Sequence, residues 1–517
     1  MSAVLKFDIQ DSFEVFQGMA HKQLDESLEK LRPLFEQDKP PTLLEISSAL
    51  QEVKQELSGA LVQDAAHSLN QQQRDQEFFP CPHCGRLVKK RVASRKIETR
   101  HGESLLSRPY CYCRHCKESF CPMDEVLELS PRKKQFDLQK LALKFLAKMP
   151  FEEAAQLFYE STGVSFSDHS LHDFFTSFAE DMSPAKVMAS ADEMARRIDE
   201  VPGKRRPVLV VATDGALMPT RTKPGRDTKR GPGEYKEAKG FRIYLNSGDR
   251  IVHLASWHQI GGKKEIKEAL KLAASRIPTD KVRVCLIGDG AHWLWEVMVE
   301  AFPSGRQILD YFHVSEYIHA VAEAQYRHDS NKAMHWTESI MARLNFTDGV
   351  RHVIAGLKRM KPTSKEAKEE IRKTVHYLER NKERIHYRGD RIGGYPIGSG
   401  GIESANKFIC HTRLKRSGAW WLKENSNKML ALRCSIVNKT FDQIFVQYSS
   451  MGKGAHGQCT NAQCSLYGLR HGTPQTSHAQ CNLSDYSATD LCLLTWLIPA
   501  FKFHAGPARA GPITLSS

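Results

Sequence analysis

The spacing of apolar residues divides the chain into segments with different expected structures. Apolar residues recur every three or four positions over 20–37 and 43–62, which predicts a helical N-terminal region, residues 1–75. Apolar and polar residues alternate within 76–125, which indicates strands, and helical spacing returns over 126–200. We therefore expect paired helices, then a β-rich module, then a second helical region.

From residue 201 onward, strands alternate with helices. The apolar runs PVLVVATD and VRVCLIGDG have the length and composition of buried strands, and amphipathic helices lie between such runs. This order predicts an α/β fold with a sheet of mixed direction over 201–447, interrupted by a helical block at about 314–390. Residues 448–517 carry few charges and many small polar residues, so we expect a poorly ordered tail.

The helical region 126–200 contains a possible helix-turn-helix. The segment FEEAAQLFYEST ends at Gly163, and a second helix, DHSLHDFFTSFAEDM, begins after a cap at Ser167 or Asp168. Two helices joined by a short turn with glycine are typical of DNA-binding helix-turn-helix modules. The second helix has histidines but no lysine or arginine, so a plain helical hairpin remains an equal alternative.

Charge and cysteine content narrow the class of protein. The 517-residue chain has a formal net charge of +14, which favours a polyanionic partner, nucleic acid before an anionic membrane surface. Its apolar runs are too short to span a membrane, and its N-terminus lacks a secretory signal, so we expect a cytoplasmic location. Thirteen cysteines, an odd number with six between Cys81 and Cys121, indicate metal ligation in a reducing compartment instead of disulfides.

Two cysteine knuckles within 76–125 predict a zinc ribbon. Cys81-Pro-His-Cys84 and Cys113-Arg-His-Cys116 each place two thiolates on a tight turn, and two such turns supply the four sulfurs that structural zinc prefers. Buried cysteines without metal are the simpler alternative. Four other residues of the segment remain alternative ligands, namely Cys111, Cys121, His83 and His115.

Three carboxylates are the best candidates for catalysis. Asp214 and Asp289 each close an apolar strand and precede a glycine, and Glu403 opens a helix after the glycine-rich turn GGYPIGSGG. Acids at neighbouring strand ends can converge on a ligand, and converging carboxylates favour Mg²⁺ or Mn²⁺. Two such ions can clamp the attacking and leaving oxygens of a phosphoryl displacement. Each acid could instead be a solvated loop or helix-end charge, and Glu296 is a rival to Glu403.

The helix that carries Glu403 has a predicted apolar stripe, formed by Ile402, Ala405, Ile409 and Thr412. This stripe leaves Glu403 on the polar flank of the helix, which suits a site and solvent equally.

Basic residues cluster at three places where DNA phosphates could bind. One cluster lies between the cysteine knuckles, one follows Asp214, and one follows Glu403 with Trp420 and Trp421 nearby for stacking. A solvated basic surface is the alternative for any single cluster. The candidate DNA-binding residues are Lys89, Lys90, Arg91, Arg226, Lys229, Arg230, Lys407, Arg413, Lys415 and Arg416.

The order of these motifs resembles a known family. Paired cysteine knuckles, a helical region, strand-TDG, strand-GDGA-x-W, LD-x-x-H and P-I-G-S-G-x-x-E-S-x-x-K over roughly 75–447 are similar to the DDE transposases of bacterial insertion sequences, of the Kra type. The resemblance implies an RNase H-like catalytic domain with a helical insertion, and it implies that Asp214, Asp289 and Glu403 are the metal-binding triad. It also implies a supporting role for Asp310 and His313, which could otherwise be a helix cap and a packed histidine.

The resulting hypothesis is a transposase. Such an enzyme binds double-stranded DNA at the ends of its element, cuts it with two Mg²⁺ or Mn²⁺ ions, and joins the freed 3′-hydroxyl to target DNA, typically as a homo-oligomer on DNA. Two alternatives remain open: a related nuclease or resolvase without strand joining, and a non-catalytic DNA-binding regulator descended from such an enzyme.

Overall fold

The structure is a computed structural model that describes residues 9–74, 76–203, 205–222, 233–247 and 250–454. The candidate DNA-binding residues Arg226, Lys229 and Arg230 lie outside these ranges, as do residues 455–517 of the expected tail. Within the described ranges, none of the helices has the length and apolarity of a membrane-spanning segment.

The N-terminal part consists of helices followed by a small antiparallel sheet. Thr42 and Glu45 cap the long helix reciprocally, because the Thr42 backbone N–H donates to the Glu45 carboxylate and the Glu45 N–H donates to the Thr42 hydroxyl. The sheet has the order β1-β2-β3-β4, with a long β2–β3 hairpin between the two cysteine turns. The elements are α1 (Ile9–Glu29), α2 (Arg32–Phe35), α3 (Leu43–Arg74), β1 (Phe78–Pro80), β2 (Leu87–Thr99), β3 (Gly102–Cys113) and β4 (Glu118–Phe120).

The next segment is helical, as its apolar spacing predicts. The helix over Phe151–Thr162 ends at Gly163, whose φ of +68° is the left-handed conformation that glycine adopts without strain. The following helix begins at the cap Ser167, whose hydroxyl accepts from the Ser170 N–H. The elements are α4 (Pro122–Val126), α5 (Phe136–Leu146), α6 (Phe151–Thr162), α7 (Asp168–Phe178), α8 (Pro184–Val187) and α9 (Ala191–Asp199).

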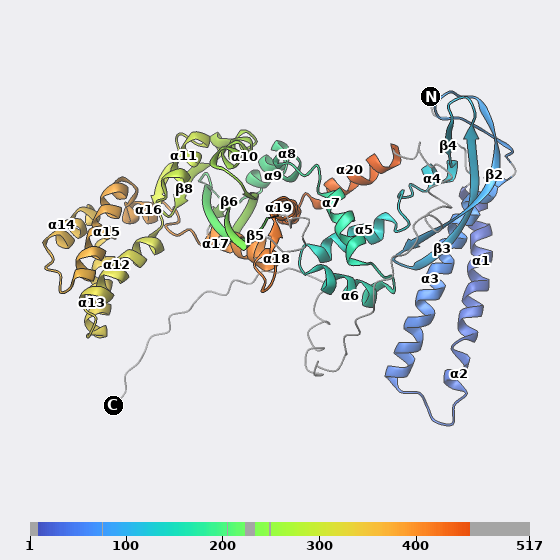
Figure 1. Cartoon of the computed structure of the whole chain (residues 1–517), viewed down its shortest axis with the longest axis horizontal. Coiled ribbons are helices and arrows are strands. Elements are labelled where there is room, and N and C mark those ends of the chain that lie inside the picture. Colours follow the sequence, from blue (N-terminus) through green and yellow to red (C-terminus); the bar gives the residue numbers. More distant parts are fainter. Residues whose placement is uncertain (1–8, 75, 204, 223–232, 248–249, 455–517) are drawn as a thin grey trace. The chain divides into compact units, whose positions relative to one another are not determined.

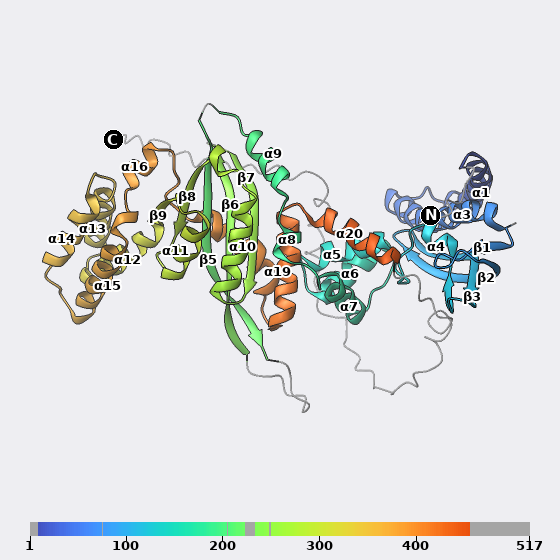
Figure 2. The same ribbon diagram turned by 90° about the horizontal axis from the view of Figure 1, so that it is seen from above.

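A mixed sheet with the order β7-β6-β5-β8-β9 forms the centre of the α/β part (Figure 2). β5 pairs antiparallel with β6 and parallel with β8, β6 pairs antiparallel with β7, and β8 pairs parallel with β9. Helices α10 and α11 lie on one side of the sheet and α17 on the other (Figure 1). The elements are β5 (Val208–Arg221), β6 (Gly233–Ser247), β7 (Arg250–Ile260), α10 (Lys263–Ser275), the 3-10 helix η1 (Thr279–Lys281), β8 (Arg283–Gly288), α11 (His292–Ala301) and β9 (Arg306–Leu309).

A set of helices lies between β9 and the element that carries Glu403. α12 and α15 pack through the stacked rings of Tyr317 and Tyr377, whose centroids are 4.0 Å apart. The elements are α12 (Tyr311–Gln325), α13 (Ser330–Arg343), α14 (Gly349–Arg359), α15 (Lys365–Asn381), the 3-10 helix η2 (Lys382–Arg384) and α16 (Tyr387–Ile392).

The last elements return to the sheet. β10 adds to the far end of β5 in parallel, and α19 packs along β7. The final helix continues to residue 454, so the first residues of the expected tail are helical. The elements are α17 (Gly400–Ala405), the π-helix η3 (Asn406–His411), α18 (Thr412–Leu414), β10 (Trp421–Leu422), α19 (Lys423–Val437) and α20 (Phe441–Gly454).

The fully buried side chain of Asn438 joins the end of α19 to β7 and α8. Its Oδ1 accepts from the Ser256 N–H at 2.8 Å and from Nε2 of His253 at 2.9 Å. Its Nδ2 donates to the carbonyls of Val187 and Ser256, both at 3.0 Å. Three of the four bonds are fully buried, and removal of the amide would leave the Ser256 N–H and C=O and the His253 Nε2 without this partner, whereas the Val187 carbonyl also accepts from the Thr440 hydroxyl.

We therefore expect Asn438→Ala to lower the free energy of unfolding by about 3–5 kcal/mol, because it leaves several buried polar groups unsatisfied. Chemical denaturation followed by circular dichroism measures this change. Asn345→Ala is the control, because the Asn345 amide donates a single hydrogen bond, to the Met341 carbonyl. Equal losses for the two variants would contradict this role for Asn438.

Candidate functional site

Three aspartates occupy matching register positions across the parallel strands of the large sheet. The last pair of the β5–β8 ladder lies two residues before Asp214 on one strand and two residues before Asp289 on the other. The last pair of the β8–β9 ladder immediately precedes Asp289 and Asp310. Because directly opposed residues of a sheet point to the same face, these three side chains belong to one row.

The strand that carries Asp214 differs from the sequence prediction. Asp289 directly follows the end of β8, as expected, but β5 continues past Asp214 to Arg221. The continuation has a physical cause, because the antiparallel partner β6 pairs with β5 over its whole length while the parallel partner β8 does not. Asp214 therefore lies within a strand, at the point where its pairing with β8 stops.

The same row extends onto the antiparallel strands. Asp214 is paired with Gly240 of β6, and Gly240 is paired with His258 of β7. A Cβ on Gly240 would lie 2.1 Å from the His258 ring, so only glycine allows the ring to occupy this position. The histidine is fully buried, and burial lowers its pKa to about 4, so the ring is neutral at physiological pH.

Asn406 connects this histidine to Asp214. Its Nδ2 donates to Oδ2 of Asp214 at 2.7 Å, and its Oδ1 lies 3.0 Å from Nε2 of His258. Because a carboxylate can only accept a hydrogen bond, the Asn406 amide must direct Nδ2 to Asp214 and Oδ1 to His258. His258 must therefore donate from Nε2. Asn406 begins the π-helix η3, a rare conformation that is frequent at functional sites.

Nearby acids and burial change the pKa of Asp214. The pKa of Asp214 is raised from an ordinary value of 3.8 to about 6, first by burial and then by the negative charges of Asp289 and Glu403. The Gly215 N–H, which donates to Oδ1 at 2.7 Å, and the His313 ring act in the opposite direction. The charges of Asp289 and Glu403 thus act on Asp214 across the row.

Contacts with β6 hold Glu403 on the same face of the sheet. Nη1 of Arg242 donates to the Gly401 carbonyl at 2.8 Å, and Gly401 packs so tightly on Tyr244 that a Cβ would lie 2.6 Å from its hydroxyl. The Ser399 hydroxyl donates to Oε1 of Glu403 at 3.1 Å. The glycine-rich turn therefore allows α17 to approach β6 closely, and the charge of Glu403 is near enough to act on the pKa of Asp214.

Asp310 joins the helical block to this turn. Its fully buried carboxylate accepts from the Phe312 N–H at 2.6 Å and the His313 N–H at 3.3 Å, which caps α12. It also accepts from the Ser399 N–H at 2.7 Å. Nδ1 of His313 lies 3.1 Å from a carboxylate oxygen of Glu316. Asp310 therefore links the start of α12 to the backbone of the glycine-rich turn.

The helical block also contacts Asp289. The Tyr377 hydroxyl donates to the Asp289 carbonyl at 2.6 Å, and the Asp289 carboxylate accepts from the Ala291 N–H at 2.9 Å. Glu296, the rival to Glu403, is directed elsewhere: its carboxylate pairs with Lys263 and, at 3.2 Å, with His292.

The acids retain free acceptor atoms. Among the described residues, Oδ2 of Asp289 and Oε2 of Glu403 have no hydrogen-bond donor, and each oxygen of Asp214 has one. Oxygen ligands of this kind fit Mg²⁺ or Mn²⁺. The carboxylate oxygens are less closely gathered than the cysteine sulfurs, which alone in the described ranges form a group whose ligand atoms all lie within 4.8 Å of one another.

That cysteine cluster consists of Cys81, Cys84, Cys113 and Cys116. The Sγ atoms of Cys81 and Cys116 are 3.9 Å apart, and those of Cys84 and Cys113 are 3.7 Å apart. Four sulfurs at the usual zinc–sulfur distance of about 2.3 Å from one ion would be about 3.8 Å apart. Backbone N–H groups, first that of Cys116, lower the pKa of Cys113 to about 7 and favour its thiolate. The cluster could therefore bind a metal such as zinc.

The four alternative zinc ligands of this segment have other surroundings or partners. Cys111 is fully buried and its sulfur is not part of the group of four. Nε2 of His83 lies 2.6 Å from the Glu118 carboxylate, and Nδ1 of His115 lies 3.8 Å from the Cys116 sulfur. Cys121 is buried and lies outside the group of four.

The candidate DNA-binding residues that lie within the described ranges differ in their exposure to solvent. Arg91, Lys407 and Lys415 are exposed, and Lys90 is partly buried. Lys89 pairs with Glu77, and Arg416 pairs with Glu153 at 3.1 Å.

Arg413 differs most from a surface residue. It is 3% exposed, and its Nε donates to the Leu146 carbonyl at 2.9 Å. Thr412, the expected member of the apolar stripe, is instead exposed. The π-helix explains both observations, because its wider turn shifts the buried position by one residue from Thr412 to Arg413.

Comparison with known proteins places the chain in a family. The chain belongs to the uncharacterised protein family UPF0236, whose model matches residues 42–443. No curated protein matches the chain. Among solved structures, the Drosophila P element transposase strand transfer complex is similar at 9% identity, covering 61% of this chain and 80% of that chain with a TM-score of 0.22. A TM-score this low establishes no shared function.

For the cysteine cluster, we expect about one zinc ion per chain and a loss of zinc in Cys84→Ser, because three thiolates bind less tightly than four. The β2–β3 hairpin should then lose protection from proteolysis. Elemental analysis and limited proteolysis measure the two effects. Cys111→Ser is the control and should retain its zinc. Zinc-free wild-type protein, or equal loss in both variants, would contradict the assignment.

For Asp214, we expect a stability that falls as the pH rises. Its folded pKa of about 6 exceeds the ordinary 3.8, so the native state binds the proton more tightly, and stability is lost between about pH 4 and pH 6. Without added Mg²⁺, Asp214→Asn should therefore be more stable than wild type at pH 8, by up to roughly 3 kcal/mol, and similar to it at pH 4.

Thermal unfolding across this pH range measures the difference. Glu296→Gln is the control, because Lys263 lowers the pKa of Glu296 and its replacement should give no gain at pH 8. A destabilised Asp214→Asn protein at pH 8 would contradict the described electrostatics.

Proposed function

We propose that the chain is a transposase of the DDE type, which cuts DNA and transfers the cut strand with divalent metal ions. The observation that carries this proposal is the row of Asp214 and Asp289 on neighbouring parallel strands, with Glu403 close enough to raise the pKa of Asp214. Three acids held together by neutral partners have little structural use without a cation.

The proposal includes an RNase H-like catalytic domain. The mixed sheet, with its antiparallel β7-β6-β5 half and parallel β5-β8-β9 half, supports this fold. The helices from α12 to α16 then form its insertion, between β9 and α17. In this arrangement Asp310 and His313 are positioning residues, because Asp310 links α12 to the turn before Glu403.

Asp214, Asp289 and Glu403 would hold two Mg²⁺ or Mn²⁺ ions. Bound there, the ions would supply an activated water or 3′-hydroxyl and neutralise charge on the phosphate. The residues of the chain have a separate role: Asn406 fixes the rotamer of Asp214, and Ser399 fixes that of Glu403. No side-chain nucleophile is required, because the attacking oxygen comes from water or DNA.

The remaining parts of the proposal concern binding. The zinc ribbon and the exposed basic residues would bind double-stranded DNA of the element ends and target, with the protein acting as a homo-oligomer on DNA. The charge of +14 and the exposed Arg91, Lys407 and Lys415 support this assignment. Phosphate contacts of this kind give affinity without reading sequence.

We expect Asp214→Asn, Asp289→Asn and Glu403→Gln each to lower the cleavage rate by about 10³-fold or more, because each removes a charge that binds metal. DNA binding should persist. The assay is cleavage of a duplex carrying the terminal DNA that flanks the gene, with and without added Mg²⁺ or Mn²⁺.

Glu296→Gln is the matched control, since this exposed acid pairs with Lys263 outside the triad and the variant should remain active. Cleavage without strand joining would identify a nuclease or resolvase, and DNA binding without any cleavage would identify a regulator. Normal cleavage by Glu403→Gln would overturn the triad.

A further inference from the structure

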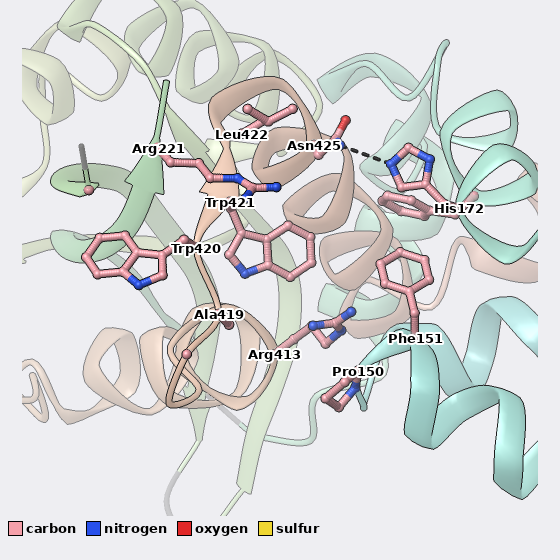
Figure 3. Close-up of a pocket in the computed structure, with 13 residues that line it drawn as sticks. Pro150, Phe151, His172, Arg221, Arg413, Ala419, Trp420, Trp421, Leu422 and Asn425 are labelled. Carbon is pink, nitrogen blue, oxygen red and sulfur yellow. Dashed lines mark hydrogen bonds between the residues drawn. The ribbon is translucent and has the colours of Figure 1, made fainter. Parts of the chain in front are cut away.

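A cavity of about 650 Å³ lies beside the end of β5 (Figure 3). Its walls come from the start of α6, from α7, from the end of β5 and from the segment between α18 and α19. Among the described residues, the lining combines aromatic rings with two arginines and includes no acidic side chain. Its volume is typical of pockets that bind an organic ligand.

Trp420 places a partly exposed indole ring at this cavity. The side chain of Trp420 is 40% exposed, although it packs on Gly233, where a Cβ would lie 2.5 Å from the ring. The ring of Tyr235 packs against it in a T-shaped contact, with ring centroids 5.8 Å apart. An exposed ring that is held in place from below is suited to stacking against another flat ring.

The arginine at the back of the cavity is charged and enclosed by aromatic rings. The Arg413 guanidinium lies 4.7 Å from the centroid of the Trp421 ring and 5.5 Å from that of Phe151. Among the described residues, no carboxylate forms a salt bridge with it. The cavity therefore retains a positive charge that the protein does not neutralise by direct pairing.

Hydrogen-bond donors without acceptors also lie at this cavity. Nε of Arg221 and Nε1 of Trp421 are buried, and neither has a partner among the described residues. Buried donors normally have acceptors, so a ligand rich in acceptor atoms would satisfy them. The lining thus fits a ligand with three properties: a flat ring, acceptor atoms and negative charge.

We propose that this cavity binds an unpaired nucleotide of DNA, with its base stacked on Trp420 and its acceptor atoms facing Arg221, Arg413 and Trp421. The inference deepens the proposed function, on which it rests, by assigning a site for a single-stranded segment. Aromatic rings combined with cations are the usual means of binding single-stranded nucleic acid.

Two continuous elements join this cavity to the acidic row. β5 runs from Asp214 to Arg221, about 23 Å at 3.3 Å per residue. The chain from Glu403 continues through η3 and α18 to Arg413. One DNA molecule could therefore reach both sites, since about seven base pairs of duplex span such a length.

The experiment compares two fluorescent duplexes of equal paired length, one blunt and one with a short thymidine overhang, bound to the full-length zinc-containing protein without Mg²⁺. Wild type should prefer the overhang. Trp420→Ala should weaken overhang binding by about five- to one-hundred-fold and leave blunt-duplex affinity within about twofold, because only stacking is lost. Trp420→Phe, which keeps a ring, should retain most of the preference.

Phe346→Ala is the control, since Phe346 is an exposed aromatic residue of the helical block and its loss should change neither affinity. Equal wild-type affinity for the two duplexes, or an equal loss for both in Trp420→Ala, would overturn the proposal. Overhang preference in a protein that never cleaves DNA would overturn only the proposed function. Triad-dependent cleavage without overhang preference would overturn only the cavity assignment.

Discussion

The pairing register of the large sheet is the constraint on which the rest of the site depends. It places His258, Gly240, Asp214, Asp289 and Asp310 in one row across β7, β6, β5, β8 and β9. A slip of one residue in any ladder would turn that strand's member of the row to the opposite face. Backbone hydrogen bonds, which do not depend on side-chain charge, therefore hold together carboxylates that would otherwise separate.

The partners of these acids show how the repulsion is tolerated. Among the described residues, no lysine or arginine pairs with Asp214, Asp289 or Glu403; backbone N–H groups, the Asn406 amide and the Ser399 hydroxyl bond to them instead. Neutral donors fix the rotamers without cancelling the charge. Burial and, to a smaller extent, the charges of Asp289 and Glu403 raise the pKa of Asp214, and a bound divalent cation would favour its charged form.

Much of this architecture follows from local sequence patterns, and the remainder follows from contacts that such patterns do not encode. Apolar runs that end in acids indicate where Asp214 and Asp289 lie, and two knuckles indicate the cysteine cluster. The roles of His258 and Asn406 depend on cross-strand pairing and on a π-helix, which periodicity does not reveal. The same extra residue in the π-turn places Arg413, instead of Thr412, in the interior.

Two buried arginines connect the end of α5 to the segment that follows Glu403. Arg413 donates to the Leu146 carbonyl, and Arg433 donates to the carbonyls of Ile409 and Ala147. Burial lowers the pKa of both guanidinium groups to about 10, so both remain charged at neutral pH. A buried charge is costly without such bonds, and the end of α5 supplies acceptors for both. Breaking these hydrogen bonds would leave buried charges without acceptors. The bonds therefore hold the helical region that begins at α5 against the segment that carries Glu403 and Arg413.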